Sequence, residues 1–170
     1  MSNDVTHEPP IGALRKGLSF RTASLIVGPD NPLIRTSQYL ASKSWLGLPQ
    51  MNEIHLTDLV DFGVLSRTHL VSVEARDPGE FVFDLYGPAT AAALAKDHAS
   101  LRLTAIEDQA YRSFVIESYK AVRDHQSPSL VEIDLLLPIL EARYKRLLYP
   151  LGHNGSVTHA LSVSVLTEPE

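Results

Sequence analysis

HLVSVEARDPGEFVFDLY, residues 69–86, is the stretch of sequence that decides the fold. Apolar side chains alternate with polar ones over residues 69–76 and again over residues 80–86, which is typical of half-buried strands. Residues 77–79 (DPG) between them are a turn signal, because proline presets φ and glycine accepts a positive φ. The stretch therefore predicts an antiparallel β-hairpin. The side chains expected to share one face of its second strand are Phe81, Phe83 and Leu85.

Three further strands are expected toward the end of the chain, over residues 130–137, 143–151 and 159–166. Residues 154–155 (Asn-Gly) are a strong hairpin signal between the last two. A strict two-residue turn would put Leu161 opposite Leu148, whereas a bulge would put Leu147 on the valine face of the last strand. We favour the bulged register, because a slip of one residue turns every side chain to the other face.

Helical spacing of apolar residues predicts helices over residues 33–46, 89–96 and 108–125, with weaker helical pieces over 51–65 and 101–106. By composition, residues 1–32 are expected to be a flexible arm, in which residues 20–27 form either a short strand or an amphipathic segment. Residues 33–170 are then a single domain with an N-terminal cap helix.

Composition excludes several classes of function. Among the 170 residues there is no Cys, which rules out disulfides, thiolate metal sites and cysteinyl-flavin photochemistry. The net charge is −5 and no dense basic run occurs, so we expect no nucleic-acid partner. No apolar run reaches ~18 residues and the first ten residues lack a signal pattern, so we expect a cytoplasmic protein with no membrane contact.

Residues 80–97 (EFVFDLYGPATAAALAKD) resemble the strand-to-helix passage of a stand-alone bacterial PAS subfamily that is common in alphaproteobacteria. The lead-in over residues 39–74 and the ending LLYPL with its turn, residues 147–155, are similar to the same subfamily. The resemblance covers roughly residues 39–166. It implies an α+β fold, with a PAS-like five-stranded antiparallel sheet, helices on one face and an N-terminal helical extension.

The resemblance also implies a function. It indicates a regulator that docks to other signalling proteins, such as a component of a sensor kinase pathway. The sequence holds no GxSxG elbow, glycine-rich phosphate loop or HExxH motif, so we expect no catalysis. The alternative is a sensor that binds a metabolite in the PAS pocket. A less favoured third reading is a small cavity enzyme of the isomerase type, in which Asp84 with Tyr86, or Asp134 with Tyr144, would act as the catalytic pair.

A PAS-type pocket lies between the sheet and the helices. The residues that we expect near it are Phe81, Phe83, Leu85, Tyr111, Phe114 and Tyr119. Ordinary core packing explains the same aromatic stripe. Haem would need an axial ligand, for which His98 and His125 are the candidates, and His125 better suits the dipole at the end of its helix. We therefore expect no haem, while a non-covalent small ligand stays open.

Three further features remain. The helix over residues 33–46, with Leu40 and Trp45 as interface candidates, is expected to pack on the open face of the sheet or to make a homodimer contact. His153 and His159 flank the last turn without an acidic cluster, so no metal site is expected. Acidic side chains on one strand face basic ones on the next, which predicts cross-strand ion pairs. These residues are Glu132, Asp134, Arg143, Lys145 and Arg146.

Overall fold

The computed structural model describes residues 17–22, 31–44, 47–137 and 140–167. The strands are β1 Gly17–Thr22, β2 Thr68–Ser72, β3 Val82–Leu85, β4 Ser129–Leu137, β5 Leu140–His153 and β6 Ser156–Leu166. The α-helices are α1 Pro32–Ser42, α2 Leu56–Asp61, α3 Pro88–Leu94 and α4 Gln109–His125. Short 3-10 turns are η1 Met51–Glu53, η2 Leu65–Arg67, η3 Pro78–Glu80 and η4 Leu103–Ala105.

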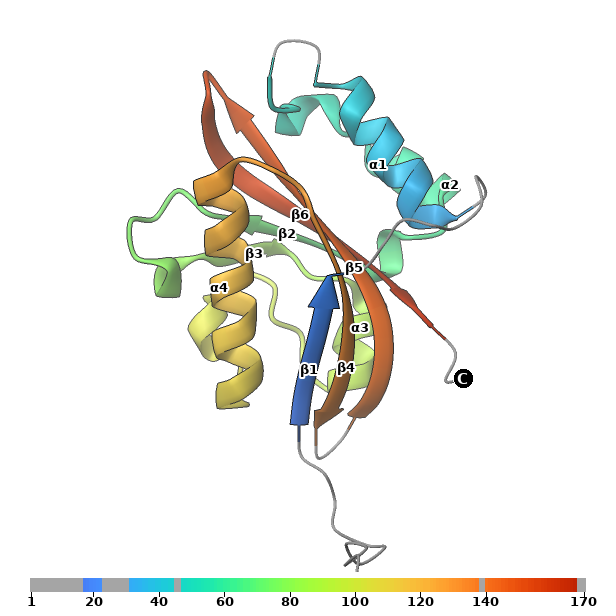
Figure 1. Cartoon of the computed structure of the whole chain (residues 1–170), viewed down its shortest axis with the longest axis vertical. Helices are drawn as coiled ribbons and strands as arrows, with labels where there is room; N and C mark the ends of the chain where they lie inside the picture. The colour runs from blue at the N-terminus through green and yellow to red at the C-terminus, as the bar shows by residue number, and fades with distance from the viewer. Residues whose placement is uncertain (1–16, 23–30, 45–46, 138–139, 168–170) are drawn as a thin grey trace, which may run out of the picture.

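The strands form one antiparallel sheet in the order β1-β4-β5-β6-β2-β3 (Figure 1). The five predicted strands and the predicted hairpin between β2 and β3 are confirmed. The backbone of β1 lies beside β4 and adds a sixth strand at that edge. The α+β, PAS-like fold class is confirmed, and β1 extends the sheet beyond the five strands that were predicted.

The register of β5 and β6 is the bulged one. Leu147 lies opposite Val163, and the register shifts by one residue between Leu151 and Gly152. Asn154 and Gly155, in the turn, have φ of 51° and 78°, as a two-residue hairpin turn with both central residues at positive φ requires.

A second bulge changes the predicted faces of β3. Leu70 lies opposite Leu85 but the next residue of β2, Val71, lies opposite Phe83. One extra residue on β3 therefore reverses the alternation. Phe83 stays on the face that packs against α4, whereas Leu85 packs among the residues of the other face. The prediction that Leu85 shares a face with Phe83 is corrected by this bulge.

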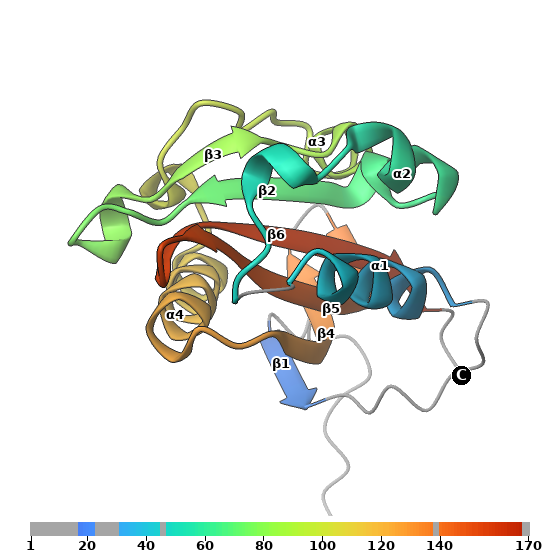
Figure 2. The same ribbon diagram turned by 90° about the horizontal axis from the view of Figure 1, so that it is seen from above.

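Helices cover both faces of the sheet. We call the face toward α3 and α4 the inner face and the face toward α1 and α2 the outer face (Figures 1 and 2). In both views the long β5–β6 hairpin separates α4 from α1. Among the residues described, no helix is long and apolar enough to cross a membrane.

Helix α1 packs on the outer face within the same chain, which is one of the two predicted arrangements. Asn31 caps it by accepting a hydrogen bond from the backbone N–H of Leu33, 2.8 Å away. Leu33 and Leu40 are buried against the leucine and valine side chains of β5 and β6. Trp45, the other predicted interface residue, lies outside the described residues.

Candidate functional site

A cavity of about 930 Å³ lies between the inner face of the sheet and helices α3 and α4. Its volume is within the range of about 300–1,000 Å³ that is usual for small-molecule sites. Much of its wall is apolar. The apolar residues that line it include Phe83, Leu94, Ile106, Val115 and Leu135.

Polar side chains reach the cavity from the central strands. In β5, residues 144, 146 and 148 alternate onto the inner face. Arg146 lies opposite Ser164 of β6, and His69 of β2 lies opposite Ser162. All four of these side chains line the cavity. The strand pairing thus brings one cation, one imidazole and two hydroxyls together on a single surface.

Arg146 is the most unusual of these side chains. It is only 5% exposed, and its Nε has no hydrogen-bond partner. No described residue forms an ion pair with it. The guanidinium carbon lies 4.9 Å from the ring centroid of Phe114, a cation–π contact from α4. The guanidinium charge is therefore buried against the aromatic ring of Phe114, and the described residues provide no counter-ion for it.

His69 is neutral and its tautomer can be assigned. Burial, with the positive charge of Arg146 adding to it, lowers the pKa of His69 to about 3. The backbone N–H of Gly87 donates to Nδ1 of His69 over 3.1 Å. A neutral ring that accepts at Nδ1 carries its proton on Nε2. His69 therefore offers a hydrogen-bond donor to the cavity.

Four tyrosines complete the polar lining: Tyr86, Tyr111, Tyr119 and Tyr144. Burial raises the pKa of Tyr119 to about 12, and Arg146 together with a hydrogen bond to Ser162 opposes that rise. Burial also raises the pKa of Tyr86 and of Tyr144 well above the ordinary value. Tyr86, Tyr119 and Tyr144 are therefore neutral at physiological pH, and each of these three hydroxyls can both donate and accept a hydrogen bond.

Charged side chains also line the cavity. Asp134 and Arg143 form the predicted cross-strand ion pair, and both line the cavity together with Glu141 and Arg67. Arg146 does not join this pair, because alternation turns its side chain to the inner face while Arg143 sits beside Asp134. The expectation that Arg146 forms a surface ion pair is therefore wrong.

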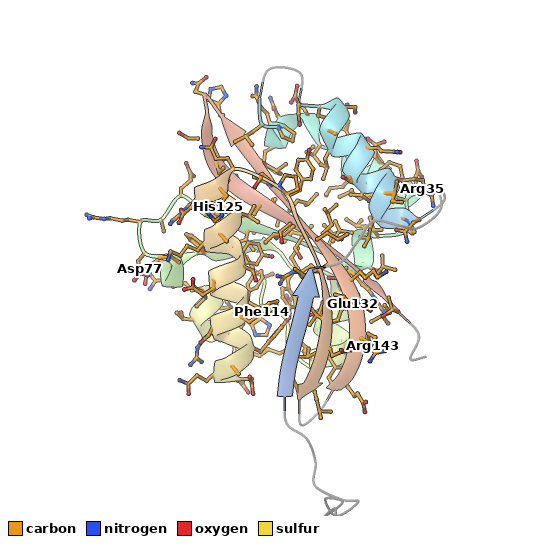
Figure 3. The ribbon with its side chains drawn as sticks, in the orientation of Figure 1. Arg35, Asp77, Phe114, His125, Glu132 and Arg143 are labelled. Atoms are coloured by element: carbon orange, nitrogen blue, oxygen red, sulfur yellow. The ribbon has the colours of Figure 1, made fainter. Side chains whose placement is uncertain are left out.

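The structure places some of the six predicted pocket residues at the cavity and others away from it. Phe83, Tyr111 and Tyr119 line the cavity. Phe114 lies on the sheet-facing side of α4, where its ring supports Arg146 (Figure 3). Phe81 is fully buried in the inner core beside the guanidinium of Arg123, and it does not line the cavity. Leu85 is on the outer face.

His98, Asp84 and His159, which the sequence suggested as candidate haem, catalytic or metal-binding residues, contact other groups. His98 is 5% exposed, packs against Tyr86, and leaves its Nδ1 without a partner. Burial lowers the pKa of His98. Asp84 lies 3.1 Å from Nε2 of His159. In the part of the chain that the structure describes, no three acidic, His or Cys residues gather as a metal site would require.

Sequence reasoning missed Arg146, His69 and Ser162 as site residues. The favoured register of β5 and β6 contained the signal for Arg146: once Leu147 faces the valines of β6, Arg146 must face α4. The same alternation in β2 puts His69 on the face of Val71 and Val73, which are inner-face residues.

Comparison with known proteins adds one structure. No family model matches the chain, and no curated protein matches it. Among solved structures, a domain of an HTR-like protein from Haloarcula marismortui matches with a TM-score of 0.43 and 14% sequence identity. The match covers 60% of this chain and 99% of that domain. A similarity of this size assigns no function.

Proposed function

We propose that this chain is a sensory domain that binds a small molecule in the inner-face cavity and signals its presence by contact with another protein. The observation that supports this function best is the cavity itself. Its wall is largely apolar, and a few polar groups converge on it, which is the usual composition of a small-molecule site. The resemblance of residues 39–166 to PAS domains favours the same class.

The site favours binding over catalysis. Of the two acid–tyrosine pairs raised from the sequence, Asp84 contacts His159, and Asp134 is paired with Arg143. Neither carboxylate is buried: their side chains are 40% and 44% exposed. A general base with a raised pKa needs a desolvated carboxyl, so we assign neither residue a catalytic role.

Ligand-observed NMR with a small set of fragments tests the binding function. The fragments are phenol, indole, benzamide and benzoate, each at millimolar concentration. Ser164 lines the cavity, so Ser164→Phe fills part of it, and Ser113→Phe on the exposed side of α4 is the matched control. We expect saturation transfer to at least one fragment with the wild type and Ser113→Phe, and its loss with Ser164→Phe. Binding to no fragment, or binding that Ser164→Phe leaves unchanged, would contradict the proposal.

A regulator that acts by protein contact alone is the second candidate. Two large apolar side chains on α2, Leu56 and Val60, are 50% and 57% exposed. At a spacing of four residues they share one side of the helix. A photo-crosslinking residue at position 60, compared with one at exposed Arg35 of α1, tests this surface in cells. The second candidate predicts a signalling protein, such as a sensor kinase pathway component, crosslinked from position 60 only; equal capture from both positions would contradict it.

A further inference from the structure

Three buried side-chain polar atoms lack a partner among the residues described, and two of them line the cavity. These two are Nε of Arg146 and the hydroxyl oxygen of Thr167. A buried polar group without a partner costs free energy, and a buried charge costs more. Arg146 is therefore poised for a group that the described residues do not supply.

The surroundings of Arg146 define the chemistry of that group. The neighbouring polar groups are the Nε2–H of His69 and the hydroxyls of tyrosine and serine, all of which can donate hydrogen bonds. A ring of donors around a cation matches an acceptor with negative charge. Asp134, which also lines the cavity, is already paired with Arg143.

From this arrangement we propose that the cavity binds a small organic monocarboxylate, whose carboxylate pairs with the guanidinium of Arg146 and whose body lies against the apolar wall. This inference rests on the proposed small-molecule function and names its ligand class. The planar fork of arginine suits a carboxylate, which can accept two parallel hydrogen bonds. A phosphate dianion fits less well, because Arg146 is the single strongly buried cation among the described lining residues.

The wall supports an apolar body. Phe83, Ile106 and Val115 line the cavity, and Phe114 holds the guanidinium from the side of α4. An aromatic or aliphatic acid would bury its hydrophobic part on this wall and place its charge at β5. Arg67 also lines the cavity but is partly exposed, so water screens its charge more strongly.

The test compares acids with their neutral amides. The probes are benzoate against benzamide and hexanoate against hexanamide, with dissociation constants measured by NMR titration. We expect each acid to bind about 10- to 100-fold more tightly than its amide. Arg146→Met should remove that preference. Arg102→Gln, which removes a cation from a surface ion pair with Glu80, should keep it.

Thermal unfolding without added ligand measures whether Arg146→Met changes the stability of the free protein. Because Arg146→Met replaces an unpaired buried charge by an apolar side chain, it should leave the melting temperature unchanged or raise it. A fall in the melting temperature would overturn the view that Arg146 is unsatisfied in the free protein. Acids that bind no better than amides, or a preference lost in Arg67→Gln and kept in Arg146→Met, would overturn the ligand class. In both cases fragments would still bind the cavity, so the failure is separate from that of the proposed function.

Discussion

Truncation of Leu40 tests whether α1 is part of the core of one chain. Leu40 is 0% exposed and packs with Leu33 against the outer face of the sheet. Replacing a fully buried leucine by alanine removes apolar contacts and leaves a cavity, at a cost of about 3 kcal/mol. For a chain of 170 residues, that loss corresponds to a fall of about 6–12 °C in the melting temperature.

Urea unfolding followed by circular dichroism measures the free energy of unfolding of Leu40→Ala. Gln38→Ala, at an exposed position on the same helix, is the control and should change stability by less than about 0.5 kcal/mol. Analytical ultracentrifugation of both variants gives the mass in solution. If Leu40→Ala kept its stability within about 1 kcal/mol but lost a dimer, α1 would be an interface helix and the reasoning from burial would fail.

Three further results are expected. A Cβ on Gly87, the N-cap of α3, would lie 2.6 Å from a backbone oxygen, so Gly87→Ala should destabilise the domain by about 1–3 kcal/mol in thermal unfolding. Gly79→Ala should be tolerated, because its Cβ would meet only side-chain atoms, a methyl group of Thr104 at 3.3 Å and the carboxylate of Asp77 at 3.4 Å. Tyr119→Phe should cost about 1 kcal/mol in urea unfolding, since it removes the hydrogen bond to Ser162; an unchanged midpoint would argue against that bond. The pKa of His69 falls from 6.5 to about 3 on folding, so the unfolded chain binds the proton first and stability should be lost as the pH falls between these two values. His69→Gln should therefore flatten the dependence of the free energy of unfolding on pH between pH 7 and 5. An equal slope in both proteins would contradict the buried, neutral state of His69.

Local patterns were sufficient for most of the fold. Alternation and turn chemistry predicted the β2–β3 hairpin, and the face of α4 followed from spacings of three and four. The register of β5 and β6 was also predictable, since only the bulged pairing puts Leu147 and Val163 together. The bulge in β3 was not, because nothing in the alternation of residues 80–86 marks an extra residue there.

The site was harder to predict because it depends on long-range pairing. The polar surface of the cavity joins the β5–β6 hairpin to β2, which lies far from that hairpin in the sequence. Because Arg146 is charged and follows Lys145 in the sequence, a position on the protein surface was expected for it. Its burial follows only when the strand register and the position of α4 are considered together.

Whether the cavity holds a small molecule is tested most directly by native mass spectrometry of the purified wild type and Ser164→Phe. Spectra are recorded without additions and with each fragment at millimolar concentration. We predict added mass on the wild type that disappears on denaturation and is absent from Ser164→Phe. The bare polypeptide mass under every condition, or the same adducts on both proteins, would contradict a ligand site beneath α4.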